Sequence, residues 1–341
     1  MAALATSPAA HLNGTSSALQ SSLLFSLTKF ARSSLIRVLT LALVHGASSW
    51  QRVVAPSESE LPCVSRDAAN RHGVRYPELV SGRLNATTLV VPIALAEARA
   101  LVPAPYAIVE AAYRELLPAF PPAMYPMLAQ IAHDHDVGVY AHGASIPDFS
   151  RASLEFPFVD PFGGHASFRW TPASLISANN PLAIWGARGY GIEVDGATFD
   201  PPCDAYAFAP ARGPPPASGH GGAATYARAR GSDNDTRFLA IEARPAAAAA
   251  AYPLAFLRNA TNQPTFAHPG ACDYYRRLFD EPDEDEGGAG APPPVVPVVA
   301  TVSAGLPPLP APRTWRGVRG WHVATPFVEP LQPQACERGE P

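Results

Sequence analysis

The chain has 341 residues, 47% of them hydrophobic and 16% charged, which is enough apolar material to bury a large core. A formal net charge of −4 gives no reason to expect a nucleic acid as a partner. The sequence contains 39 prolines, and an internal proline removes a backbone donor and clashes with the preceding turn. The composition therefore disfavours long helices and favours a mainly β protein with long irregular connections.

The first 49 residues have the pattern of a targeting segment. No acidic residue precedes Glu58, residues 38–44 form an apolar run, and residues 47–49 are small. A basic region, a short apolar run and a small-residue site are typical of a secretory signal, and this run is too short to span a bilayer. We therefore expect a secreted protein without a membrane span after processing. The acid-free, Ser- and Arg-rich composition also suits a mitochondrial presequence, which is the alternative.

Glycosylation acceptors and cysteines agree with secretion. Three Asn-x-Thr triplets begin at Asn85, Asn234 and Asn259. The four cysteines form an even set without a CxxC spacing, which favours two disulfides over a zinc site; they are Cys63, Cys203, Cys272 and Cys336. Of the three connectivities that four cysteines allow, we expect Cys203–Cys272 to close the irregular middle and Cys63–Cys336 to tie the ends.

Short strand signals follow a polar lead-in at residues 50–87. The first β-branched run is 88–93, followed by a helical turn at 97–101, a segment at 107–113 that fits strand or helix, and a proline-rich loop at 118–126. Further strands are predicted at 137–140, 152–156, 166–170, 182–185, 190–194, 224–228, 238–242, 295–302 and 320–324. Closely spaced short strands separated by turn residues indicate a sandwich or a barrel.

Two low-complexity inserts interrupt the strand pattern. Residues 209–223 are rich in Pro and Gly, and residues 280–294 begin with an acidic run, which repels itself and stays solvated. We expect both inserts to be disordered. One domain over residues 88–335, followed by a tail at 336–341, is the resulting prediction, and the sequence leaves the oligomeric state open.

The most metal-like feature is His133-Asp-His135-Asp. Two histidines at positions i and i+2 of a strand point to one face and can share an ion. A cupin-type site also needs a Glu a few residues on, and none is present. We therefore favour a polar loop before a strand and expect no metal or other cofactor, with a His-dependent metal enzyme as an alternative. A serine hydrolase is disfavoured because the sequence has no Gly-x-Ser-x-Gly motif.

Three blocks between residues 88 and 200 resemble the acetoacetate decarboxylase family. Residues 177–193 resemble the segment that precedes the catalytic lysine of that family, residues 98–105 resemble its Val-Pro-x-Pro entry, and residues 152–156 look like its strand with an active-site glutamate. The blocks occur in family order. The resemblance implies a cone-shaped antiparallel β-barrel with a few short helices, long Pro/Gly-rich loops and an active site in its interior.

The lysine on which that family's chemistry depends is missing. The family forms a Schiff base between a neutral lysine amine and a β-keto acid. Counting without gaps from Gly186, the family's lysine pair falls on Val194 and Asp195, and the only lysine of the sequence is Lys29. Arginine is no substitute, because a guanidinium does not deprotonate in proteins. Schiff-base decarboxylation is therefore not expected.

The remaining residues of these blocks predict a binding pocket. Glu155 is the candidate general acid or base, provided that burial raises its pKa, and Arg188 is the candidate for holding a carboxylate or enolate. Three aromatic side chains are expected to line an apolar cavity: Trp170, Trp185 and Tyr190. The alternative is structural, with Glu155 paired to Arg169 or Arg188 and the tryptophans in the core.

From these residues we expect a protein that binds or transforms a small keto-acid or polyketide-type metabolite. Its activity, where it has one, would be lyase-like without a Schiff base. A non-catalytic, secreted small-molecule-binding protein is the alternative.

Overall fold

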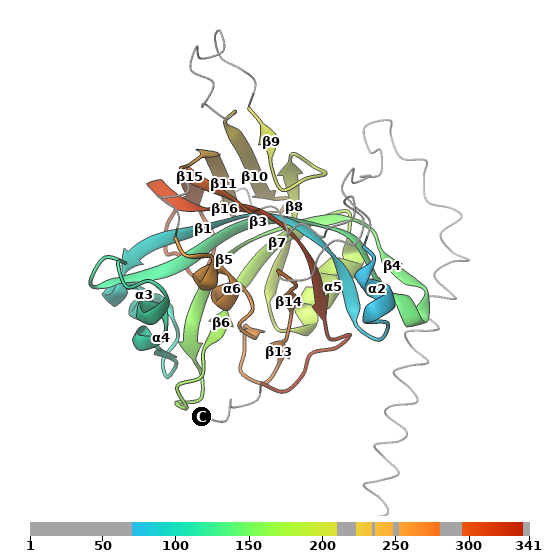
Figure 1. Ribbon diagram of the computed structural model, residues 1–341, viewed down its shortest axis with the longest axis horizontal. Helices are drawn as coiled ribbons and strands as arrows, with labels where there is room; N and C mark the ends of the chain where they lie inside the picture. The colour runs from blue at the N-terminus through green and yellow to red at the C-terminus, as the bar shows by residue number, and fades with distance from the viewer. Residues whose placement is uncertain (1–69, 210–222, 234–235, 248–251, 280–294, 337–341) are drawn as a thin grey trace, which may run out of the picture. The chain divides into compact units, whose positions relative to one another are not determined.

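The computed structural model describes residues 70–209, 223–233, 236–247, 252–279 and 295–336 (Figure 1). With 49% strand and 16% helix, it is mainly β. The fold class predicted from the sequence is thereby confirmed.

Nine strands close into a barrel. Each strand is hydrogen-bonded to the next in the order β5 (Phe149–Asp160), β7 (Ala173–Ser177), β8 (Glu193–Asp200), β10 (Thr225–Gly231), β11 (Phe238–Pro245), β15 (Val295–Ala304), β16 (Arg313–Glu329), β1 (Val80–Ala94) and β3 (Met124–Val139). The ring closes because β3 also pairs with β5. Neighbouring strands are antiparallel except β7 and β8. Closure leaves no free sheet edge within the ring.

Small and branched aliphatic side chains fill the barrel. On β10, β11 and β15 every second residue is buried, including Ala227, Ala229, Leu239, Ile241, Ala243, Val298, Ala300, Val302 and Ala304. Because strand side chains alternate between faces, this set points inward. The register places Ala227, Ile241 and Val302 in one row.

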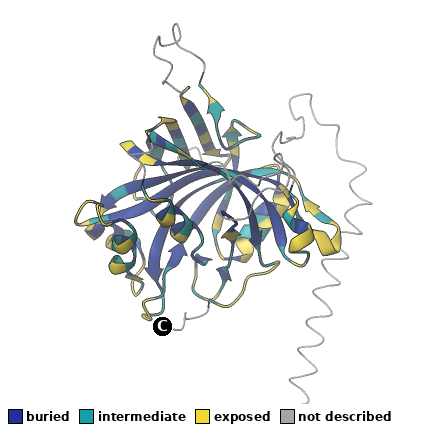
Figure 2. Ribbon diagram, in the orientation of Figure 1, coloured by how far each residue is buried: buried dark blue, intermediate teal, exposed yellow. Residues whose placement is uncertain are grey.

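A second layer of short elements packs against the outer face of four long strands, β1, β3, β5 and β16. Both β1 and β3 are buried along almost their whole length, as a sheet covered on both faces requires (Figure 2). The covering elements are β6 (Phe168–Trp170), β12 (Thr265–Phe266), β13 (Cys272–Asp273), β14 (Arg276–Arg277) and α6 (Leu254–Thr261). They connect through the pairs β5–β6, β6–β12, β12–β13 and β14–β16.

The five helices of the described residues are short, as the proline content predicts. Besides α6 they are α2 (His72–Arg75), α3 (Leu95–Leu101), α4 (Glu110–Leu116) and α5 (Pro181–Gly189). Minor elements are β2 (Ala107–Ile108), β4 (Ala144–Ile146), β9 (Ala207–Phe208) and the 3₁₀ turn η2 (Tyr140–His142). Within the described ranges, no helix has the length and apolar character needed to cross a membrane.

Local capping overrules one predicted strand. The strand expected at 182–185 is wrong, because these residues belong to α5. Asn180 caps the helix by accepting a hydrogen bond from the Ala183 amide, and Pro181 occupies its first turn, where its fixed φ suits a helix. The strand expected from residue 190 begins at Glu193 instead.

Other boundaries also differ from the prediction. The first long strand begins at Val80, inside the expected lead-in, rather than at residue 88. The polar loop predicted at His133 is wrong: this histidine lies within β3, buried between two neighbouring strands. Residues 1–49 and the predicted insert at 280–294 lie outside the described residues. Of the predicted insert at 209–223 the structure describes only residues 209 and 223, and of the predicted tail at 336–341 only Cys336.

The predicted disulfide pairing is wrong, because Cys272 bonds to Cys336. The segment that follows β16 returns to β13, where Cys272 and Gln334 pair as an antiparallel bridge. Tertiary topology therefore brings these two cysteines together. Cys203 is also disulfide-bonded, and Cys63 lies outside the described residues.

Candidate functional site

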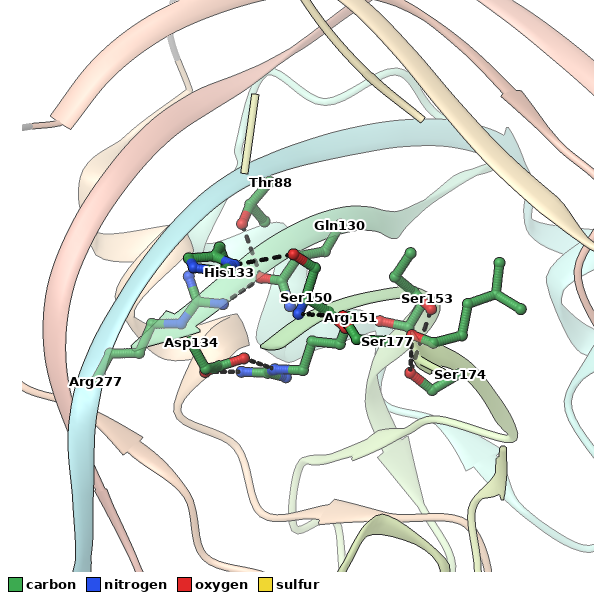
Figure 3. A network of polar contacts seen from close by, with 12 residues as sticks. Thr88, Gln130, His133, Asp134, Ser150, Arg151, Ser153, Ser174, Ser177 and Arg277 are labelled. Atoms are coloured by element: carbon green, nitrogen blue, oxygen red, sulfur yellow. Dashed lines mark hydrogen bonds and ion pairs between the residues drawn. The ribbon is translucent and has the colours of Figure 1, made fainter. Parts of the chain in front are cut away.

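Polar and charged side chains gather on the face of β3 and β5 that points to the second layer. We call them the arginine–glutamate cluster: Gln130, Arg151, Glu155, Arg169 and Arg277. The register places Gln130 opposite Thr88 on one side and Ser153 on the other, so these side chains share a face (Figure 3). Four members are at most 5% exposed, namely Gln130, Glu155, Arg169 and Arg277. Charged groups are seldom buried so deeply unless they are paired or functional.

Glu155 is ionised by its surroundings. Its Oε1 accepts hydrogen bonds from Ser153 Oγ at 2.9 Å and Gln130 Nε2 at 3.3 Å, and its Oε2 lies 3.4 Å from Arg169 Nη1. Burial raises the pKa of Glu155, but the nearby guanidinium groups outweigh burial and hold the pKa below its ordinary value. The condition for a general acid, a raised pKa, is therefore not met.

Arg169 ties the second layer together. Its Nε and Nη2 both donate to Thr265 Oγ1, at 3.0 and 2.7 Å, and its Nη1 donates to the Thr261 carbonyl at 2.9 Å. Together with the Glu155 ion pair, these contacts link β6 to α6 and β12. The structural alternative, that Glu155 pairs with Arg169, is the one the structure shows.

Arg277 is the incompletely paired member of the cluster. Its Nη2 donates to Gln130 Oε1, which also accepts from Thr88 Oγ1 at 2.9 Å. Within the described residues, Arg277 Nε and Nη1 and the neighbouring Tyr275 hydroxyl are buried without a hydrogen-bond partner. Burial lowers the pKa of Arg277 to about 10, so the side chain stays charged at neutral pH. Unpaired buried donors are costly and rare, and each needs an explanation.

The balance of charges within the arginine–glutamate cluster also identifies Arg277 as incompletely paired. Arg151 pairs with Asp134 at 2.7 Å, and Arg169 pairs with Glu155 at 3.4 Å. No carboxylate of the described residues forms an ion pair with Arg277. The cluster therefore contains one buried cation whose counter-ion the described part of the chain does not supply.

Two carboxyl groups lie near the cluster, Asp273 on β13 and Glu329 at the end of β16. Burial raises the pKa of Asp273 to about 6, against the opposing effect of Arg169 and Arg151. Burial and the charge of Asp273 raise the pKa of Glu329 well above its ordinary value. The two groups thus compete for ionisation and hold protons at mildly acidic pH.

We expect the Asp273 carboxyl to contribute a stabilisation that falls as the pH rises from about 4 to about 6, whereas His322, whose pKa burial lowers to about 4, contributes a slope of the opposite sign over the same range. The pKa of Asp273 is about 6 in the folded protein against an ordinary value of 3.8, so over this range the folded state keeps a proton that the unfolded state has lost. The resulting stabilisation is complete below the lower pKa and is lost as the pH passes the higher one. Urea denaturation at several pH values measures the slope. Asp273→Asn should make the slope more positive than in the wild type, while the exposed Asp233→Asn should leave it unchanged; an unaltered slope in Asp273→Asn would contradict the assignment.

The other predicted site residues are dispersed. Arg188, on α5, is exposed and donates to the Val194 carbonyl at 2.9 Å. Trp185 is 65% exposed, Tyr190 is buried with its hydroxyl bonded to the Pro330 carbonyl, and Trp170 is buried with its indole N–H bonded to the Ala267 carbonyl. No described contact joins Glu155 to Arg188.

The cluster was only partly predictable from sequence. Glu155 was identified through the family-like strand, and Arg169 as its structural partner. Gln130 and Arg277 lie outside the matched blocks, and no local pattern distinguishes Arg277 from its exposed neighbour Arg276. Only the pairing of β14 with β16 brings Arg277 to β3.

The two positions that the resemblance aligns with the family's lysine pair have ordinary structural roles. Val194 is 4% exposed and packs with Ile176 and Ala183. Asp195 forms an ion pair with Arg237 at 2.7 Å.

The histidine motif lies on the opposite face of β3. His133 is paired with Asn85 across the strands and is 1% exposed, and its Nδ1 lies 2.9 Å from Ser150 Oγ. Burial lowers the pKa of His133. The rings of His133 and His135 are 6.3 Å apart. In the part of the chain that the structure describes, no group of three His, Cys, Asp or Glu residues is suited to hold a metal ion.

Two of the predicted glycosylation acceptors can be placed. Asn85 is half-buried in β1, and Asn259 is exposed on α6, where its side-chain oxygen accepts a hydrogen bond from Gln263. Asn234 lies outside the described residues. Modification of these residues stays a prediction.

Comparison with known proteins gives matches among solved structures only; no family model and no curated protein matches. An acetoacetate decarboxylase-like enzyme from Sphingomonas wittichii RW1 is 11% identical, with a TM-score of 0.39, over 82% of this chain and 100% of that one. The enduracididine biosynthesis enzyme MppR complexed with pyruvate is 12% identical, with a TM-score of 0.37, over 84% of this chain and 100% of that one. The first of these structures carries in its name the family that the sequence resembles.

Proposed function

We propose that this protein binds a small metabolite carrying a carboxylate or enolate, of the keto-acid or polyketide type, against Arg277. The observation that carries the proposal is the buried Arg277 guanidinium, which has donors without partners and no counter-ion among the described residues. A ligand carboxylate supplies both the charge and the acceptors. Hydrogen bonds to charged groups contribute about 1.5–3 kcal/mol each, enough to offset the cost of burying the cation.

Neighbouring groups favour a small, partly apolar anion. The Tyr275 hydroxyl is a further unpartnered donor, and the Tyr275 ring stacks on Phe327 with centroids 4.9 Å apart. Gln130 is held by Thr88 and Glu155 and so keeps the Arg277 guanidinium in place. Arginine next to aromatic rings suits the planar carboxylate and carbonyl of a keto acid.

Binding in this proposal is non-covalent. The described residues contain no lysine, and Lys29 is the only lysine of the sequence. After treatment of the protein and a β-keto acid with borohydride, residues 30–341 should therefore carry no adduct, because they contain no lysine amine to form an iminium for hydride to reduce. A trapped adduct would refute a Schiff-base-free site.

The decisive experiment is a calorimetric titration with pyruvate as the probe. Arg277→Met should weaken binding by about 100-fold or more, the equivalent of about 2.7 kcal/mol. Its thermal stability should not fall, because methionine replaces a buried charge that lacks a counter-ion. Arg276→Met, on the exposed neighbour in the same strand, is the matched control and should bind like the wild type. Equal pyruvate affinity in the wild type and Arg277→Met would overturn the proposal.

We also propose that the protein is secreted. The support is the signal-like residues 1–49 and the three Asn-x-Thr triplets. Expression of the full chain in a secreting cell should place it in the medium, with a mobility that increases after treatment with an N-glycosidase. Recovery in mitochondria would instead establish the alternative.

A further inference from the structure

We propose that the Cys272–Cys336 disulfide is a redox-sensitive latch that holds Tyr275 and Arg277 in the binding site. The choice of ligand in this inference rests on the proposed function. The restraint by the disulfide rests on the geometry of the chain around β13. Reduction of the bond would release the latch and lower ligand affinity.

The latch consists of residues 330–336, which we call the C-terminal strap. The backbone of Gln334 pairs with that of Cys272 through two hydrogen bonds, of 2.8 and 3.1 Å. The Tyr274 hydroxyl donates to the Ala335 carbonyl at 3.2 Å, and the Tyr190 hydroxyl donates to the Pro330 carbonyl at 3.3 Å. The strap therefore lies along β13 and ends in the disulfide.

The segment under the strap carries the proposed ligand-binding donors. Tyr275 and Arg277 follow Cys272 along the chain, in or beside the two-residue strands β13 and β14. Each of these strands pairs over two residues only, β13 with β12 and β14 with β16. Side chains supply the other backbone bonds: Asp273 Oδ1 accepts from the Tyr275 amide, and Asn262 Oδ1 accepts from the Arg277 amide.

Such short pairings hold a segment only weakly. Strands of two residues contribute few hydrogen bonds, and segments with few buried backbone contacts open locally at low free-energy cost. The buried cation lowers the cost of opening further, because opening returns the Arg277 guanidinium, which lacks a counter-ion, to water. A covalent bond at the start of the segment therefore adds to the packing of Tyr275 as a restraint on where Tyr275 and Arg277 lie.

The bond is open to exchange from one side. Cys272 is fully buried, whereas Cys336 is half-buried at the end of the strap. A dithiol reductant attacks the accessible sulfur and forms a mixed disulfide, which its second thiol then resolves. The reductant gives up two electrons and two protons and becomes a disulfide, the sulfur–sulfur bond breaks, and Cys272 and Cys336 become thiols. The strap then keeps only its hydrogen bonds.

Hydrogen exchange and calorimetry together test the latch. Cys336→Ser should increase amide exchange over residues 272–277 by about tenfold or more and weaken pyruvate binding by about tenfold. Cys203→Ser is the matched control, since it removes the disulfide bond of Cys203 and leaves Cys272–Cys336 in place. It should change neither quantity. Treating folded Cys203→Ser protein with dithiothreitol should then reproduce both effects, which keeps the test decisive if Cys336→Ser does not fold.

The two measurements separate the latch from the proposed function. Unchanged exchange at 272–277 after loss of the disulfide would overturn the latch, whatever the protein binds. Faster exchange with unchanged pyruvate affinity would overturn its link to the site. If the oxidised wild type fails to bind pyruvate, the proposed function fails, while the exchange measurement still decides whether the disulfide restrains the segment.

Discussion

Replacing Arg169 with methionine is expected to lower the free energy of unfolding by about 3–5 kcal/mol. The substitution leaves the buried Glu155 carboxylate without its ion-pair partner, and it leaves the Thr261 carbonyl and Thr265 hydroxyl without their donor. Removing one member of a buried charge pair is costly because the remaining charge stays desolvated. Urea denaturation of Arg169→Met against the wild type measures the loss.

Arg188→Met is the matched control. Arg188 is exposed and its described side-chain bond is to a single carbonyl, so its replacement should change the free energy of unfolding by less than about 1 kcal/mol. Combining Arg169→Met with Glu155→Gln should recover part of the loss, because the stranded charge is then removed as well. Equal losses in Arg169→Met and Arg188→Met would show that the ion pair does not support the fold.

Gly320→Ala is expected to destabilise the protein by about 3 kcal/mol or more. Gly320 lies opposite Leu89 in the antiparallel pair of β16 and β1. An added Cβ would lie 2.1 Å from the Thr88 carbonyl oxygen and 2.7 Å from Leu89 Cα. Both are backbone atoms of the paired strand, so the clash is relieved only if the two strands separate. Thermal denaturation should show a large fall in Tm.

Gly186→Ala supplies the comparison for this substitution. Gly186 lies in α5, where an added Cβ meets nothing within 4 Å. Because alanine is a better helix former than glycine, this variant should be stabilised by about 0.5–1 kcal/mol. A Gly320→Ala protein as stable as Gly186→Ala would mean that β1 and β16 are less closely paired than described.

The candidate site shows most clearly what could be predicted from the sequence and what depended on the tertiary structure. The strand at 152–156 could be predicted because a strand has a local signature, and it lies within β5, whereas Glu155 was identified in it only through the family resemblance. Its function could not be predicted, because the pKa of Glu155 depends on guanidinium groups from β5, β6 and β14. Arg188 looked equally suitable in sequence, yet α5 places it on the surface.

By itself the sequence determined three properties of this protein: a mainly β fold, short helices, and a chain whose only lysine is Lys29. Each follows from composition or from short-range periodicity, which do not depend on distant contacts. Only the tertiary structure decided that Cys272 bonds to Cys336 and that Arg277 meets Gln130. The physical reason is that both outcomes depend on strand pairing and burial among residues brought together by folding, and a single sequence carries no local signal for such contacts.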